Sequence, residues 1–183
     1  MVHKIYTRIK IILHKIRIDN LNLRQKGSNV IISEGFNFNK PENIEIDSHV
    51  YVGPEATMYA HGSIRIKSGS IIGPKVTIYT ANHNFKSGAE AIPYDHKLDI
   101  QSVEIDENVW VGGNVLLLPG AKLREGVIVG AGTVISKEIP AYSIVVGSPC
   151  IVIGTRDIEE YKRLKEKNAI YLIKKAEKNA KKI

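Results

Sequence analysis

The sequence has almost no cysteine and no long apolar run, and both absences narrow the class of protein. Cys150 is the only cysteine among 183 residues, so an intramolecular disulfide and a zinc site of four thiolates are both excluded. No stretch approaches the roughly 18 uninterrupted apolar residues of a membrane span, because charged side chains such as Lys10 and Arg17 interrupt the apolar N-terminal segment. We therefore expect a cytoplasmic protein of ordinary globular composition.

The net charge of +7 belongs to the two ends of the chain. Residues 1–26 hold seven Lys or Arg and one Asp, and residues 157–183 hold nine Lys or Arg and five Asp or Glu, which leaves the middle slightly acidic. A nucleic-acid-binding domain presents a basic stripe on its folded surface, together with aromatic or arginine side chains that read bases. Neither feature is present, so we expect no nucleic-acid partner.

A six-residue period runs through the chain from Ile46. An aliphatic residue opens each repeat and glycine often follows it, as in the run Ile105, Val111, Leu117, Leu123, Val129, Ile135. This period fits neither a helix nor an alternating strand, but it fits short strands joined by corners. Three strands would close a coil of about 18 residues, and coils would stack at the ~4.8 Å spacing of paired strands. We expect the glycines to supply corner dihedrals that a Cβ would resist. The period predicts an all-β coil rather than a β-sandwich.

The segments outside the period divide the chain into three parts. We expect a basic amphipathic helix or cap at 1–26, a β-helix at 27–155 with a projecting loop at 84–101, and a helical cap at 156–183. The N-terminal helix is expected to hide the open end of the β-stack. A weak contact with an anionic membrane surface is its alternative role.

Residues 71–85 read IIGPKVTIYTANHNF, and residues 103–153 carry Trp-Val-Gly, Leu-Pro-Gly, Gly-Ala-Gly-Thr-Val, Lys-Glu-Ile-Pro and Gly-Ser-Pro-Cys in that order. These stretches resemble the hexapeptide-repeat acyltransferases, whose fold is a left-handed parallel β-helix, and are similar to their acetyl-CoA-dependent branch. The resemblance implies a homotrimer with active sites between neighbouring prisms and direct acetyl transfer from acetyl-CoA, without a metal. Asn84 follows His83 where the serine, maltose and galactoside acetyltransferases commonly have proline. This difference favours the sugar- and polysaccharide-modifying relatives.

Acetyl transfer to a hydroxyl needs a base near the acceptor proton and donors near the developing oxyanion. His83 is the expected general base, because imidazole is largely free to accept a proton at neutral pH and this residue lies where the projecting loop begins. In the resembling enzymes the amide at the position of Gly113 faces the acetyl carbonyl. We therefore expect His83 and Gly113 to be the catalytic pair.

The coenzyme is expected to contact small residues along the coil and cations for its phosphates. Trp110 is expected to wall the cleft beside His83. Arg156 is expected to replace the basic residue that the resembling enzymes often have where this chain has Ile151. The full set of predicted coenzyme-binding residues is Trp110, Gly112, Gly113, Gly130, Ala131, Gly132, Ser136, Lys137 and Arg156.

The acceptor is expected to bind beside the base, and its identity cannot be read from the sequence. The period places His61 close to the level of His83, and the two loop residues Asp95 and His96 are expected to contact the acceptor or to orient His83. The predicted acceptor-binding residues are Tyr59, His61, Asn82, Asp95 and His96.

Three other functions compete with sugar O-acetylation. N-acetylation of a nucleotide-linked amino sugar needs the same base, but the resembling N-acetyltransferases often carry a nucleotide-binding domain ahead of the repeats, which the short N-terminal segment is not expected to form. A metal-dependent hydratase resembling the γ-class carbonic anhydrases needs a His-x4-His spacing, which the six histidines lack. A non-catalytic scaffold is expected to have lost His83 or the coenzyme residues.

Overall fold

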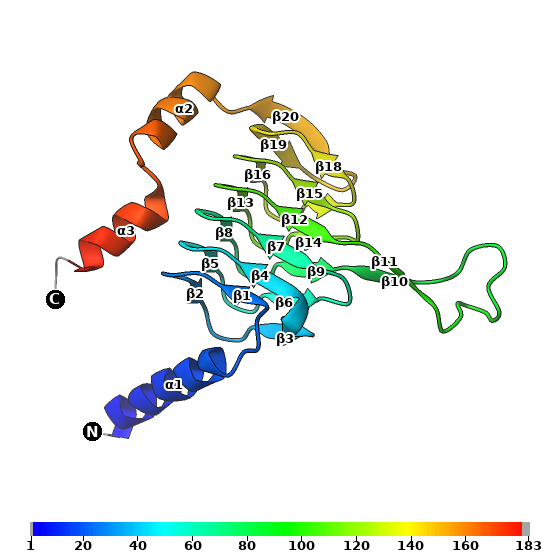
Figure 1. The fold of residues 1–183 in the computed structure, drawn as a ribbon, viewed down its shortest axis with the longest axis horizontal. Coiled ribbons are helices and arrows are strands. Elements are labelled where there is room, and N and C mark those ends of the chain that lie inside the picture. The colour runs from blue at the N-terminus through cyan, green and yellow to red at the C-terminus, as the bar shows by residue number, and fades with distance from the viewer. Residues whose placement is uncertain (1, 181–183) are drawn as a thin grey trace.

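The computed structural model describes residues 2–180 and shows a left-handed parallel β-helix with helices at both ends of the chain (Figure 1). Three parallel sheets form the sides of a triangular coil. Sheet A contains β1 (Gln25–Lys26), β4 (Ile44–Ile46), β7 (Ile64–Ile66), β12 (Val103–Ile105), β15 (Lys122–Leu123) and β18 (Glu138–Ile139). Sheet B contains β2 (Ile31–Ile32), β5 (Tyr51–Val52), β8 (Ile71–Ile72), β13 (Trp110–Val111), β16 (Ile128–Val129), β19 (Ser143–Val146) and the antiparallel β20 (Ile151–Thr155). Sheet C contains β3 (Asn37–Asn39), β6 (Thr57–Tyr59), β9 (Thr77–Tyr79), β14 (Leu116–Leu117) and β17 (Val134–Ile135).

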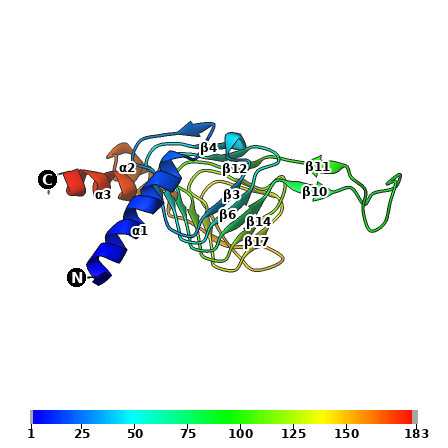
Figure 2. The same cartoon turned by 90° about the horizontal axis from the view of Figure 1, so that it is seen from below.

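The remaining elements lie outside the coil. An antiparallel hairpin of β10 (Ala81–His83) and β11 (Leu98–Ile100) projects from the corner between sheets C and A (Figures 1 and 2). The short 3-10 helix η1 (Pro41–Asn43) occupies the same corner one level below β6. The helices are α1 (Val2–Asp19), α2 (Ile158–Glu166) and α3 (Tyr171–Ala180). We call the three corners of the coil AB, BC and CA after the sheets they join.

The aliphatic residues that open each repeat fill the inside of the coil, as the period predicts. Residues such as Ile46, Ile105, Leu117 and Leu123 have no exposed surface. Burying an aliphatic side chain of this size stabilises a fold by about 1.5–3 kcal/mol. The first coil was not predicted from the period, because its opening strand is the polar pair Gln25–Lys26, which also lies just before the expected start of the β-helix at 27.

The glycines that follow these aliphatics are needed for space rather than for unusual dihedrals. Gly53, Gly73 and Gly112 stack at the BC corner, and none has a positive φ. A Cβ on Gly73 would lie 2.6 Å from the carbonyl carbon of Gly112, and one on Gly112 would lie 2.7 Å from the nitrogen of Ala131. Positive φ occurs instead two residues later, for example at Lys75. The expectation that these glycines supply corner dihedrals is therefore wrong, because the stacked backbones leave no room for a Cβ.

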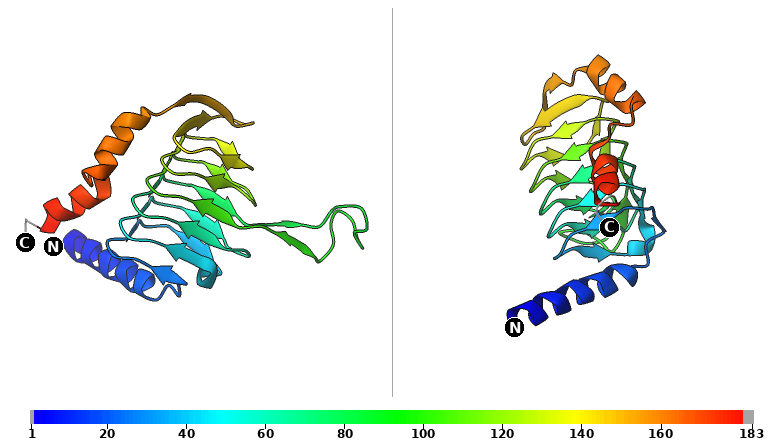
Figure 3. Two further views of the ribbon diagram at one scale, coloured as in Figure 1. Left: turned by 45° about the horizontal axis from the view of Figure 1, so that its top comes forward. Right: turned by 90° about the vertical axis from the view of Figure 1, so that its left-hand side faces the viewer.

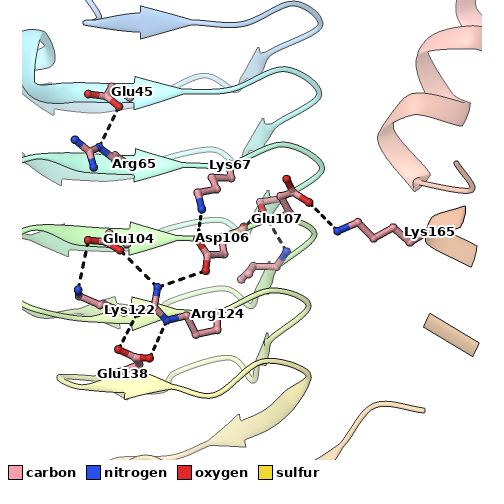
Figure 4. A network of polar contacts seen from close by, with 12 residues as sticks. Glu45, Arg65, Lys67, Glu104, Asp106, Glu107, Lys122, Arg124, Glu138 and Lys165 are labelled. Atoms are coloured by element: carbon pink, nitrogen blue, oxygen red, sulfur yellow. Dashed lines mark hydrogen bonds and ion pairs between the residues drawn. The ribbon is translucent and has the colours of Figure 1, made fainter. Parts of the chain in front are cut away.

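The outer face of sheet A carries a ladder of opposite charges (Figure 4). Glu45 pairs with Arg65, and Arg124 contacts Glu104 and Asp106 on the level below and Glu138 on the level above. A bidentate contact with Arg124 holds the pKa of Glu138 below its usual range. Each pair is partly exposed and is worth less than about 1 kcal/mol. Their alternation nevertheless favours this register, because a shift of one level would place like charges together.

The C-terminal helices run down the AB corner and do not cover the end of the stack (Figures 1 and 3). Asp157 caps the start of α2 by accepting a hydrogen bond from Glu160 N–H. Tyr161 is buried, which raises its pKa to about 12, and its hydroxyl donates to Glu125. Lys165 pairs with Glu125 as well. The C-terminal helices, expected as a cap, thus lie along the AB corner, and the antiparallel strand β20 is the last strand of sheet B.

The glycine column at the BC corner predicts a steric effect that one substitution can test. Gly73→Ala should lower the melting temperature, with a loss of about 1–3 kcal/mol, because its Cβ would overlap the backbone of the next coil. Gly154→Ala is the control, since the nearest atom to its Cβ would be 4.0 Å away. Thermal unfolding followed by circular dichroism measures both variants. Equal melting temperatures for the two variants would contradict the steric reading.

Candidate functional site

A hollow of about 480 Å3 lies at the CA corner, where the hairpin leaves the coil. Four of the predicted residues line it: Tyr59 and His61 from the level below, and Asn82 and His83 from β10. Tyr79, Ala81, Leu98 and Leu118 complete its wall. The structure therefore brings the predicted base together with three predicted acceptor-binding residues, in a depression with a largely apolar wall.

His83 is exposed at the end of β10, and the projecting loop holds its ring. The imidazole stacks on the ring of Tyr94, with centroids 3.9 Å apart and planes inclined by 17°. Stacking favours one plane for the ring, and among the described residues no hydrogen bond engages its nitrogens, which leaves them open to a partner. Sequence reasoning missed Tyr94, because nothing in the local pattern indicates which loop residue folds back onto β10.

Asp95 holds the loop together rather than contacting His83. Its carboxylate is 3% exposed and accepts hydrogen bonds from the Asn84 side chain and from the N–H groups of Glu90 and Lys97. Burial of the carboxyl opposes its ionisation, but these hydrogen bonds outweigh that effect, so the pKa of Asp95 lies below its ordinary value. The carboxylate is already engaged inside the loop, where it fixes the segment that carries Tyr94. His96, next to it, is exposed and does not line the hollow.

The wall of the hollow includes a stacked pair of tyrosines. Tyr59 and Tyr79 occupy equivalent places on consecutive coils, and their rings are parallel with centroids 4.9 Å apart. Tyr79 was not among the predicted residues, although the period places it directly above Tyr59. The pair gives the hollow aromatic edges and two hydroxyl groups.

The predicted glycines lie at the BC corner, on the other edge of sheet C. On the levels of β5 and β8 the residue after the corner glycine is proline, Pro54 or Pro74, whereas on the next two levels it is Gly113 or Ala131. Within residues 2–180, no acceptor is found for the N–H groups of Gly113 and Ala131. Gly130 and Gly132, by contrast, donate to Val145 and Gly113 carbonyls. The corner therefore presents two open backbone donors.

Ser136 and Lys137 line a second hollow, of about 430 Å3, together with Ser148, Pro149 and Cys150. It lies near the top of the stack, beyond the end of β17. Lys137 has no carboxylate partner among the ion pairs of the described residues, so its charge is available to a ligand. Burial raises the pKa of Cys150, which favours the neutral thiol.

Arg156 and Trp110 lie elsewhere. Arg156 donates to the Gly126 carbonyl and lies over the Tyr161 ring, at the AB corner. Trp110, 54% exposed on the outer face of sheet B, lines a hollow of about 250 Å3 with Arg156 and the C-terminal helices. Within one chain, therefore, Arg156 lies apart from Lys137, the other predicted phosphate contact, and Trp110 lies apart from His83. His83 and Gly113 are also separated, by the width of sheet C.

No three His, Cys, Asp or Glu side chains of the described residues form a group that could hold a metal ion. In the same part of the chain, no helix is both long and apolar enough to cross a bilayer.

The known proteins that this chain resembles are named as transferases or acetyltransferases. Residues 102–137 match the family described as bacterial transferase hexapeptide (six repeats). The chain is 37% identical over 133 residues to a Staphylococcus aureus (strain MRSA252) protein named provisionally as an acetyltransferase, covering 72% of this chain and 64% of that protein. It is 32% identical over 144 residues to the galactoside O-acetyltransferase of Lactococcus lactis subsp. lactis (strain IL1403), covering 74% and 66%. The chain thus spans less than two thirds of the length of these relatives.

A solved structure shows the same fold. The hexapeptide-repeat acetyltransferase of Vibrio cholerae O1 biovar eltor, complexed with acetyl-CoA, superposes with a TM-score of 0.70 at 21% identity, covering 78% of this chain and 76% of that one.

The buried carboxylate of Asp95 predicts how the loop responds to substitution and to acid. Asp95→Ala should speed amide hydrogen exchange at Glu90 and Lys97 by about tenfold, because each N–H loses its acceptor, a bond worth roughly 1.5–3 kcal/mol when its acceptor is charged. Since the folded pKa is lowered, the stabilisation is complete above the ordinary value of about 4 and is lost as the pH falls through the folded pKa.

The control is Asp99→Ala, which removes the more exposed ion pair with Lys86 on the same hairpin. Exchange at Glu90 and Lys97 should be unaffected by this change. Unchanged exchange in Asp95→Ala would show that the carboxylate does not hold the loop.

Proposed function

Because the chain belongs to the hexapeptide-repeat transferase family, we propose that it transfers an acetyl group from acetyl-CoA to a hydroxyl of a sugar or glycan. The observation that carries this proposal is the exposed His83 imidazole at the mouth of a hollow lined by Tyr59, Tyr79 and Asn82. The galactoside O-acetyltransferase match supports a sugar acceptor, and polysaccharide biosynthesis is the process it would serve. The single cysteine suits a cytoplasmic enzyme.

In this mechanism His83 accepts the proton of the acceptor hydroxyl as its oxygen attacks the acetyl carbonyl. The carbon–sulfur bond then breaks, the acetyl group stays on the acceptor oxygen, and His83 returns the proton to the departing thiolate of coenzyme A. Stacking on Tyr94 keeps the imidazole edge directed outward, so little reorganisation is needed before proton transfer. The aromatic and apolar wall of the hollow suits the C–H surface of a sugar, while Asn82 and the tyrosine hydroxyls suit its hydroxyl groups.

The open N–H of Gly113 suits the oxyanion that forms on the acetyl carbonyl. Coenzyme A presents amides and phosphates, and the chain offers the small residues Gly112, Gly130, Ala131 and Gly132 along one edge of sheet C. Ser136 and Lys137 lie at the other edge, where the lysine could pair with a phosphate. Trp110 and Arg156 remain predicted coenzyme contacts that would need a different subunit.

A second copy of the chain would complete the site. The base and the oxyanion donor lie at opposite edges of sheet C, so a neighbour that turns its BC corner and sheet B toward the hairpin would bring its Gly113 and Trp110 to His83. The outer face of sheet B supports such a contact, because it is a continuous apolar column where sheet A is charged. Its members are Ile31, Tyr51, Ile71, Trp110, Ile128 and Ile144. We propose a homotrimer.

His83→Ala should lower kcat by about 10²–10⁴, the usual contribution of general-base catalysis, while acetyl-CoA still binds. Free thiol release with a panel of sugars, amino sugars and serine measures the rate and identifies the acceptor, which also separates O- from N-acetylation.

His96→Ala is the matched control, since this second loop histidine lies outside the hollow. Its rate should stay within about threefold of wild type. If His83→Ala keeps more than about a tenth of wild-type turnover, the base lies elsewhere and His61 becomes the next residue to change.

The assembly makes its own prediction. Light scattering should give three times the chain mass of 20.3 kDa. Ile128→Glu should reduce that mass and abolish activity, because it places a charge in the apolar column of sheet B, whereas Glu138→Gln on sheet A should do neither. A fully active monomer at micromolar concentration would contradict the shared site.

A further inference from the structure

Helix α1 is attached to the β-helix only near its C-terminal end. His14 Nε2 donates to the Ile32 carbonyl, and Arg17 donates to the Phe36 carbonyl and lies over the Phe36 ring. Ile18 packs against the core beside them. The preceding turns extend away from the coil (Figures 1 and 3). The expected capping of the stack is therefore done by the end of α1 and the segment that follows, rather than by the apolar face of the helix.

That apolar face is unpartnered. At 100° per residue, Ile5, Ile9, Ile12, Leu13 and Ile16 fall on one stripe, and His14 falls on the opposite side. Each side chain of the stripe is exposed, by 49–59%. Five large, exposed aliphatic side chains on one face of a helix form an apolar patch that solvated helices rarely expose, so the stripe indicates a partner.

The charge around the stripe selects the kind of partner. Arg8 and Lys15 lie along one border of it, and Lys10 and Arg17 lie along the other. The only carboxylate in α1 is Asp19, at its end, and no ion pair within residues 5–180 involves Arg8, Lys10 or Lys15. An apolar stripe with basic borders is the pattern of helices that lie in the surface of an anionic bilayer.

Helix α3 adds positive charge on the same side of the molecule. Lys174, Lys175 and Lys178 are exposed on it, with Glu177 as the only acid. Helices α1 and α3 both lie on the side opposite the hairpin β10–β11 (Figures 1 and 2). Basic side chains near a bilayer that contains anionic lipids are each attracted to it, which adds to the burial of the stripe.

We propose that α1 docks the protein on an anionic lipid surface, with the stripe in the headgroup region and α3 contributing lysines. A second copy fits less well, because two α1 helices side by side would bring basic borders together without carboxylates to pair with them. In this orientation the hollow around His83 faces away from the lipid, so a water-soluble coenzyme reaches it freely. Docking of this kind is independent of acetyl transfer.

Vesicle flotation with the full chain tests the proposal. Wild type should float with vesicles of phosphatidylcholine and phosphatidylglycerol at low salt, and should bind phosphatidylcholine alone at least about tenfold less. Ile9→Glu/Ile12→Glu should reduce binding to the anionic vesicles at least about tenfold, because both glutamates enter the stripe. Binding should also fall as salt rises.

Ile11→Glu is the matched control, since Ile11 is 58% exposed but lies off the stripe. It should bind anionic vesicles as wild type does, and all variants should keep wild-type acetyl transfer in solution. The proposal is overturned if anionic vesicles do not bind wild type, or if the stripe variant and Ile11→Glu bind them equally. A loss of oligomer mass in the stripe variant would overturn it too, because the stripe would then be an interface between copies.

Discussion

The coils of this protein stack at the distance of hydrogen-bonded strands, and that distance leaves no space for a Cβ on the three glycines that open the BC corner. Gly53, Gly73 and Gly112 meet backbone atoms of the coil above so closely that a single Cβ would overlap them. A Cβ at any of these three positions would push the neighbouring coils apart at this corner. The same close stacking places the N–H groups of Gly113 and Ala131 at the surface, where proline occupies the lower levels. The backbone donors of the candidate site thus lie directly beside the glycine column.

The three outer faces of the prism have different chemistry, and each suits a different neighbour. Sheet A pairs its own charges, as Arg124 and Glu138 illustrate, and needs only solvent. Sheet B presents an apolar column that suits another protein surface. Sheet C carries open donors at one edge and His83 at the other, and this separation is why the proposed reaction needs a second copy. The position of each functional group thus follows from which face and which corner its repeat occupies.

The projecting hairpin departs from the repeat, and it determines the geometry around the base. The Asp95 carboxylate is buried away from water and accepts hydrogen bonds from three donors within the loop. The loop that it fixes places the Tyr94 ring against the His83 ring. A buried carboxylate with this many hydrogen bonds is a structural anchor first. Its effect on His83 is indirect, through the segment that it fixes.

The sequence alone determined the fold, because a six-residue period of aliphatics buries them all on the inside of a three-sided coil of short strands. It also determined that Tyr59, His61, Asn82 and His83 share one corner. Such residues are related by the repeat itself, so their spacing along the chain converts directly into spacing in the structure. Only the tertiary structure decided that Tyr94 stacks on His83, that Asp95 turns into its own loop, and that Trp110 and Arg156 lie away from the base. These contacts depend on how irregular segments fold back onto the coil, which no period encodes. The tertiary structure also decided which way the α1 stripe points, because the sequence pattern shows only that one face of the helix is apolar.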